Sequence, residues 1–402
     1  MKSTVFAAFM LALSAVPANA EDAMNDDDRH GTGHGSDHGT GHHEEHGKSH
    51  DKAHGDHGAG HGAHGAMPAI HHDPIGVMGS HLTEPGKVMV SLRYQRMQME
   101  GSRIGTDPVS PETIATTVPN RFFGQPMQPP TLRVVPLDMS MDMIMAGAMV
   151  GVTDWLTLMA MGMFVEKSMD HVTFQGPTGT TELGNFTTGA SDFGDTTVTA
   201  LARIFDVKTA GGAHHKALLN LGASLPTGSI VETDAVLTPL NMTPTLRLPY
   251  PMQLGSGTFD LQPGFTYTGM HDSVKWGAQY KATVRLGNND QGYTFGDAQY
   301  LTAWGQYATS DLIAFSLRGA FTAQNAIEDS DASIVAPVQT ANPDFQGGDR
   351  LDVGVGFNLN PQSGALRGHG FGVEMLFPVY QDLNGPQLET DWTLTIGWHT
   401  VL

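Results

Sequence analysis

From Lys87 to the C-terminus the chain alternates polar and apolar residues with a period of two. In residues 274–286, for example, Lys275, Gln279 and Arg285 alternate with valine, tryptophan, alanine, tyrosine and leucine. Because successive side chains of a β-strand point to opposite faces, this pattern predicts strands with one apolar and one polar face. A soluble sandwich would bury the apolar face, whereas a membrane barrel turns it toward lipid.

Three features favour the membrane barrel. The segments are about 10 to 14 residues long, as a tilted membrane-crossing strand requires. Tryptophan and tyrosine lie near strand ends, as in the aromatic girdles of membrane barrels. Long and short connections alternate, as expected of outside loops and periplasmic turns. We therefore expect an all-β fold over residues 86–402, a transmembrane antiparallel β-barrel of about twelve strands. These strands are expected near residues 87–98, 137–150, 155–167, 193–206, 214–226, 257–268, 273–287, 293–308, 310–322, 349–360, 367–380 and 389–402.

The first twenty residues have a lysine, an apolar run and the ending Ala18-Asn19-Ala20, which predicts a cleaved signal peptide at 1–20. The chain has no cysteine, which excludes disulfides, thiolate metal sites and a lipid-anchor cysteine. Its net charge of −20 gives no electrostatic reason to bind nucleic acid. We expect the barrel in the cell outer membrane of a Gram-negative bacterium, surrounded by outer-membrane lipid and transiently bound by the barrel-assembly machinery. An even strand number would place the N-terminal tail in the periplasm.

Residues 21–85, between the signal peptide and the barrel, are rich in histidine, glycine and acidic residues. Such a composition predicts a disordered, metal-binding tail. Neutral imidazole binds Cu(II), Zn(II) and Ni(II), and the spacing selects none of them; no cofactor is required. The alternative is a solvated linker with incidental metal affinity. The candidate ligands are His30, His34, His38, His42, His43, His46, His50, His54, His57, His61, His64, His71 and His72.

Methionine is the second candidate ligand. It recurs on one face of two predicted strands, opposite an apolar face, so we expect Met89, Met97, Met99, Met159, Met161 and Met163 to point into the lumen. A third group is ambiguous because aspartate and serine on its other face compete for the inside; it contains Met139, Met141, Met143, Met145 and Met149. Thioethers suit Cu(I), so copper is the favoured metal. The alternative is that methionine is an adaptable apolar filler of the wall.

Charged residues on the polar faces are also expected in the lumen. Mixed charges inside a barrel require water or partners. Two interpretations remain open: ion pairs that brace the wall, or a selectivity filter for solutes. The residues are Arg93, Arg203, Asp260, Lys275, Lys281, Arg285, Arg318, Asp352, Glu374, Asp391 and His399.

Three short stretches carry a family resemblance: Leu225-Pro226-Thr227-Gly228, the run LGSGTFDLQPG at 254–264, and Thr153-Asp154-Trp155-Leu156. Together they resemble a family of outer-membrane transporters named for the meta-pathway of phenol degradation. The resemblance covers roughly residues 75–402 and implies a barrel that passes small molecules. Its glycines and prolines bend or end strands, so no functional residue is carried over.

These observations favour an outer-membrane transporter or channel whose periplasmic tail binds a transition metal, with a small-molecule solute as partner. One alternative is a pore for small apolar or aromatic compounds. Another is a plugged membrane anchor that carries a metal-buffering tail. We do not expect an enzyme, because no nucleophile and base are spaced for catalysis. The barrel histidines are scattered, at His171, His214, His215, His271, His369 and His399.

Overall fold

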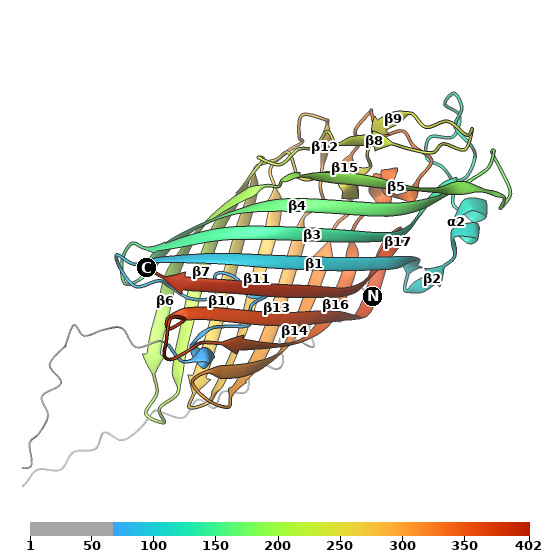
Figure 1. Cartoon of the computed structure of the whole chain (residues 1–402). Coiled ribbons are helices and arrows are strands. Elements are labelled where there is room, and N and C mark those ends of the chain that lie inside the picture. Colours follow the sequence, from blue (N-terminus) through green and yellow to red (C-terminus); the bar gives the residue numbers. More distant parts are fainter. Residues whose placement is uncertain (1–66) are drawn as a thin grey trace, which may run out of the picture. The chain divides into compact units, whose positions relative to one another are not determined.

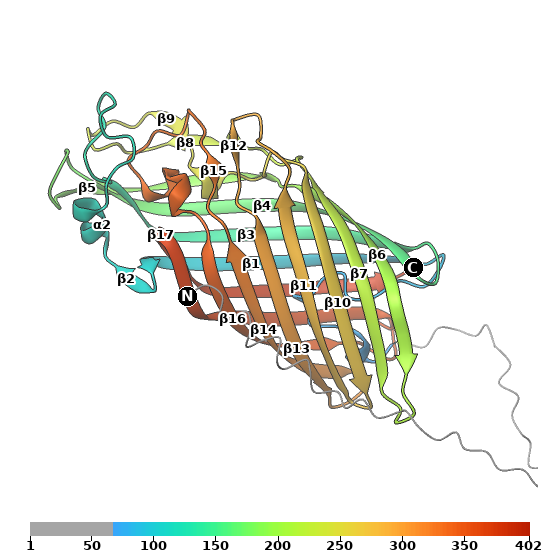
Figure 2. The same ribbon diagram turned by 180° about the vertical axis from the view of Figure 1, so that it is seen from behind.

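The computed structural model describes residues 67–402, which form one long antiparallel sheet that closes into a barrel (Figures 1 and 2). The strand order is β17-β16-β14-β13-β11-β10-β7-β6-β4-β3-β1, and pairing of β1 with β17 closes the circle. This confirms the predicted transmembrane β-barrel. The predicted signal peptide and the predicted ligands from His30 to His64 lie outside the described residues.

The sheet has thirteen strands, of which β2 (Asp107–Val109) and β5 (Glu182–Phe193) each pair with a single neighbour, and eleven form the wall. The wall strands are β1 (Val88–Gly105), β3 (Val134–Gly151), β4 (Leu156–Phe174), β6 (Thr196–Lys208), β7 (His214–Leu225), β10 (Asp260–His271), β11 (Val274–Arg285), β13 (Ala298–Ala308), β14 (Ile313–Gln324), β16 (Gly348–Leu359) and β17 (His369–Val401). Strand β17 pairs with β16 through residues 371–383 and with β1 through residues 387–401 and Leu383. It therefore supplies two segments of the wall, in agreement with the expected number of about twelve.

The two ends of the barrel differ in their connections. We call one end the turn end, because only short connections lie there: 152–155, 209–213, 272–273, 309–312 and 360–368. We call the other end the loop end, where the longer connections lie: 106–133, 175–195, 226–259, 286–297 and 325–347. The predicted alternation of long and short connections is confirmed, except that the connection expected at residues 381–388 is absent, because these residues belong to the continuous strand β17. The loop end carries the helix α2 (Pro111–Thr117) and the short strands β8 (Thr233–Ala235), β9 (Thr245–Arg247), β12 (Tyr293–Thr294) and β15 (Glu328–Asp329). It also carries the 3-10 turns η3 (Tyr250–Met252), η4 (Gln339–Ala341) and η5 (Pro343–Phe345).

Strands β1 and β4 extend well beyond their predicted limits at the loop end, and β3 begins three residues earlier than predicted. They have 18, 18 and 19 residues, more than the 9–11 or so that cross a bilayer. Strand β5 pairs with residues 164–174 of β4 and widens this extension (Figure 1). The predicted strands were too short because their length was matched to the membrane thickness. In the structure the hydrogen-bonded ladder continues past that thickness into the loop end.

The outer face of the wall is apolar. Large side chains that remain about half exposed point outward from most wall strands: Leu92, Ile144, Leu158, Leu221, Phe265, Leu317, Val355 and Ile396. A soluble sandwich would bury such side chains, whereas hydrocarbon accommodates them. Within residues 67–402, no helix is long and apolar enough to cross a membrane.

Candidate functional site

The N-terminal segment Met67–Gly86 enters the barrel from the turn end. Near its start, the amide of Ala69 donates to the carbonyl of Asp311 (2.8 Å), and at its end the amide of Gly86 donates to Gly151 (2.8 Å). We call it the lumenal segment, and it includes the 3-10 turn η2 (Ala69–His71). The sequence prediction assigned residues 67–85 to the disordered tail. This part of the prediction is wrong, because these residues are ordered against the inner wall.

Polar side chains of the wall hydrogen-bond to the backbone of the lumenal segment. A segment without strand partners needs other donors for its carbonyl groups, since an unpaired buried carbonyl is costly. The wall donates from Lys275 Nζ to His71 (2.9 Å), from Gln306 Nε2 and Asn358 Nδ2 to His72 (3.0 and 2.9 Å), from Gln279 Nε2 to Met78 (2.9 Å) and from Asn220 Nδ2 to Gly79 (2.7 Å). The polar faces of these strands therefore hold the segment in place.

Most of the predicted lumenal charges form ion pairs. Arg318 binds Glu374 through two hydrogen bonds of 2.9 and 2.5 Å, and both side chains are buried. The other pairs are Lys275 with Asp73 (2.9 Å), Arg350 with Asp352 (3.0 Å) and Arg285 with Asp260. Within residues 67–402, Arg93 and Lys281 form no such pair. The wall therefore contains both braces and two unpaired cations.

Two of the predicted lumenal charges lie elsewhere. Asp391 is exposed, because a register shift leaves it as an extra residue on β17 between Thr390 and Trp392, which pair with Met99 and Gln98 of β1. Such a bulge changes the face to which a side chain points. Arg203 contacts Asp154 in a turn (3.0 Å) at the turn end.

The methionine stripes line the inner face of the wall. On β3, Ile144 is 50% exposed whereas Met145 is 6% exposed, so odd-numbered residues point inward. Asp142 points outward and pairs with Arg96 (3.1 Å). The ambiguous group Met139, Met141, Met143, Met145 and Met149 therefore faces the lumen.

These methionines form two packed groups. At the loop end, Met139 and Met169 pack with Leu248 and Met252 of connection 226–259, and Met99 and Met163 lie against them. Toward the turn end, Met89 and Met149 pack with Leu201, and Met159 and Leu82 lie against them. Met97 and Met161 are half-buried on the same strands. Methionine thus lines one side of the lumen between the loop end and the lumenal segment.

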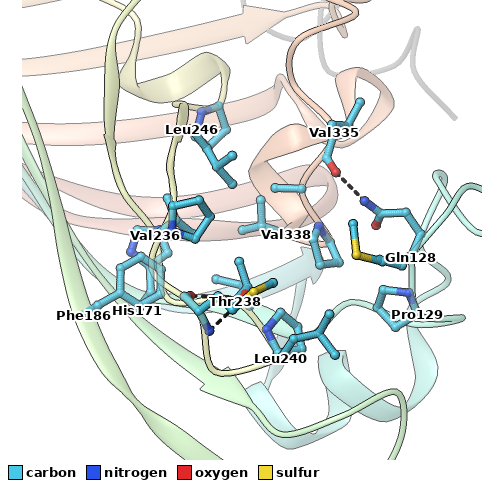
Figure 3. A pocket seen from close by; sticks show the side chains of 18 of the residues that line it. Gln128, Pro129, His171, Phe186, Val236, Thr238, Leu240, Leu246, Val335 and Val338 are labelled. Carbon is cyan, nitrogen blue, oxygen red and sulfur yellow. Dashed lines mark hydrogen bonds between the residues drawn. The ribbon is translucent and has the colours of Figure 1, made fainter.

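A pocket of about 490 Å³ lies among the long connections at the loop end (Figure 3). Its lining is mostly apolar and rich in proline, and it comes from residues 126–129, 176–177, 236–249 and 335–338 together with the ends of β3, β4 and β5. Prolines stiffen the connections that form the wall of the cavity. Leu248 lines this pocket and also packs against Met139, so the pocket adjoins the methionine wall.

Two polar atoms of the pocket lining lack partners. His171 on β4 stacks on Phe186 of β5, with ring centroids 4.7 Å apart and planes 9° apart. His171 Nδ1 and the hydroxyl of Thr188 are buried and make no hydrogen bond in the described part of the chain. Buried polar atoms are normally paired. An apolar cavity with a flat stacked wall and two unsatisfied polar atoms is suited to a small planar molecule that carries a hydrogen-bonding group.

Buried cations hold the connections around the pocket. Arg133 is fully buried and donates to the carbonyls of Ala115, Gln175, Gly176, Thr178 and Gly179, between 2.8 and 3.4 Å away. Lys167 donates to the carbonyls of Pro251 and Gln253 (2.8 and 2.6 Å), and Arg247 pairs with Asp331 (2.9 Å). Burial raises the pKa of Tyr250 and of Tyr293, so both phenols stay neutral. These residues were not predicted, since no local pattern in the sequence marks a cation that binds distant carbonyls.

The residues that carry the family resemblance are structural. The motif glycines Gly228 and Gly255 pack backbone to backbone, and a Cβ on Gly255 would lie 2.5 Å from the carbonyl oxygen of Gly228. Asp195 joins them by accepting from the amides of Gly228 (2.9 Å) and Ser256 (2.7 Å). These contacts close the ends of β6, β7 and β10 and do not touch the pocket.

No family model and no curated protein matches the chain, so the resemblance to the phenol-pathway transporters stays a prediction. Among solved structures, an outer membrane channel from Pseudomonas putida F1 is 13% identical, with 81% of this chain and 99% of that chain covered and a TM-score of 0.48. A FadL homologue from Pseudomonas aeruginosa is 11% identical (84% and 99% covered, TM-score 0.40). The toluene transporter TodX from P. putida is 10% identical (79% and 92% covered, TM-score 0.34). Sequence identities and TM-scores this low do not indicate which solute passes through a barrel.

Proposed function

We propose that this chain is an outer-membrane channel of a Gram-negative cell that takes up small apolar molecules, including aromatic ones. The observation that carries the proposal is the apolar pocket at the loop end, with the unpartnered His171 Nδ1 and Thr188 hydroxyl. The loop end then faces the outside, because long loops lie there in outer-membrane barrels. The lumenal segment Met67–Gly86 then enters from the periplasm.

The lumenal wall supports a route for such a molecule. Methionine side chains lead from Leu248 beside the pocket to Leu82 of the lumenal segment. Thioethers are flexible and polarisable, so they adapt to passing solutes and contact aromatic rings favourably. The segment occupies the end of this route, and we infer that solute release requires it to shift.

The pocket favours a phenol over a hydrocarbon of the same size. A small rotation of the His171 or Thr188 side chain would bring its buried polar atom to a hydroxyl on the ring, whereas toluene would leave both atoms unsatisfied. One hydrogen bond contributes about 1 kcal/mol, which corresponds to about a fivefold preference.

Initial uptake of radiolabelled phenol and toluene in intact cells tests this. A deletion strain would carry the wild-type chain, Thr188→Val, Phe186→Ala or the control Thr187→Val. The hydroxyl of Thr187 points to the opposite face of β5 from Thr188 and binds Asp170 of β4. We expect Thr188→Val to lower phenol uptake alone and Phe186→Ala to lower the uptake of both. Equal uptake of both solutes in all strains, including the empty vector, would refute the proposal.

We also propose that the histidine-rich tract from His30 to His64 binds a transition metal, with copper favoured. Its support is the density of imidazole and carboxylate groups in the sequence. Cellular copper, zinc and nickel would be measured in strains with and without residues 22–64. A metal content that does not change when the tract is removed argues against this role, and the tract is then a linker.

A further inference from the structure

Four metal-ligating side chains meet where the lumenal segment touches the wall near the turn end. His72 and His81 come from the segment, Met89 from β1 and His399 from β17. His81 Nε2 lies 3.3 Å from the sulfur of Met89. The ring centroid of His72 lies 4.3 Å from that of His399 and 6.4 Å from that of His81.

The ligand types of this group indicate which ion it suits. Within residues 67–402, no three His, Asp or Glu side chains are arranged to hold an ion. A site here must therefore use the thioether of Met89. A thioether with imidazole is a soft ligand set, which suits Cu(I) and disfavours hard oxygen-seeking cations.

One further observation points to a ligand, and a second indicates the charge of that ligand. His399 Nε2 is buried and has no hydrogen-bond partner among the described residues, although such atoms are normally satisfied. The surrounding charge is nearly balanced, because Asp73 and Lys275 pair with each other beside His72. A monovalent ion is therefore tolerated better than a divalent one next to the unpaired Arg93.

We propose that Cu(I) binds between His81 and Met89, with His72 or His399 as a further ligand, and ties the lumenal segment to the barrel wall. Binding replaces the contact between His81 Nε2 and the Met89 sulfur with two metal bonds and involves no redox step. The bound ion holds the segment inside the lumen, so Cu(I) acts as a ligand that closes the channel. This inference does not depend on which solute the channel carries.

Hydrogen exchange resolved by peptide tests the proposal on the full-length protein in detergent, with and without Cu(I) under reducing conditions. Its readout is local, so metal bound by the histidine-rich tract does not obscure it. We expect Cu(I) to slow exchange of peptides within residues 69–86 in the wild type. The variants Met89→Leu and His81→Gln should lose this effect, with an affinity at least about tenfold lower. Met97→Leu is the matched control, because Met97 lies on the same face of β1 away from the group.

A second measurement keeps the outcome clear if a variant folds poorly. X-ray absorption of Cu(I)-loaded wild-type protein should show a sulfur neighbour, and Met89→Leu should remove it while Met97→Leu retains it. Slowed exchange that persists in both site variants, or no Cu(I) effect in the wild type, would overturn the proposal.

Discussion

The ammonium group of Lys275 on β11 lies 2.9 Å from a carboxylate oxygen of Asp73 in the lumenal segment. The indole nitrogen of Trp304 donates to the same oxygen (3.1 Å), and both charged side chains are buried. Two parts of the chain that are about 200 residues apart are thus joined inside the barrel. Because the pair is buried, loss of either partner leaves an uncompensated charge.

Lys275→Met should release the lumenal segment. Breaking a buried ion pair costs about 3–5 kcal/mol, which is enough to weaken a segment held mainly by hydrogen bonds. We expect higher single-channel conductance in planar bilayers and faster exchange of residues 69–86. Lys216→Met, which removes a half-exposed lysine, should leave both unchanged. Unchanged conductance in Lys275→Met would show that the segment does not limit the current.

Gly76→Ala should have a similar effect through sterics. A Cβ at Gly76 would lie 2.1 Å from Glu374 Oε1 and 2.4 Å from Arg318 Nη2. Either the segment moves out or this ion pair breaks, so we expect larger conductance and a lower midpoint of urea unfolding. Gly162→Ala is the control, since nothing lies within 4 Å of its Cβ position. If Gly76→Ala behaves like that control, the packing around Gly76 is looser than these distances indicate.

Arg133→Leu should loosen the pocket without opening the barrel. The guanidinium organises residues 175–179 through their carbonyls, and its removal leaves several buried acceptors unpaired, at about 1–3 kcal/mol each. We expect faster proteolysis of this connection and weaker phenol uptake, with conductance unchanged. The control Arg121→Leu removes one hydrogen bond to Asn342. The protease should cleave this variant no faster than the wild type. Normal proteolysis of Arg133→Leu would argue against this role.

The unpaired cations Arg93 and Lys281 should make the open channel favour anions. Fixed positive charge on a pore wall attracts anions and repels cations. In a background opened by Lys275→Met, the double change Arg93→Gln and Lys281→Gln should shift the reversal potential in a salt gradient toward cation preference. Lys208→Gln, at an exposed position at the turn end, is the comparison. If the double variant and the Lys208→Gln variant have identical reversal potentials, Arg93 and Lys281 have no role in ion selectivity.

The strands could be predicted because their signal is local. Alternation in residues 274–286 marks both a strand and its inward face, and Lys275 and Gln279 do point inward to the lumenal segment. The predicted ends failed at β1, β3 and β4, because the ladder continues beyond the membrane there. Asp391 was misplaced because one bulge reverses the alternation.

The site residues could be predicted only in part. The methionine stripes and most wall charges were found, since they follow the same alternation. His171 looked like one of several scattered histidines, and only its stacking on Phe186 reveals the pocket. The same holds for His399, which meets His72 across more than 300 residues of sequence.

By itself, the sequence determined that this chain forms a barrel, which face of each strand is apolar, and at which end the long connections gather. These properties depend on residues next to each other, because a β-strand repeats every two residues. Only the tertiary structure decided what fills the lumen and what forms the pocket. Both arise where irregular segments need distant donors for their carbonyl groups, as Asn358 supplies for His72 from 286 residues away.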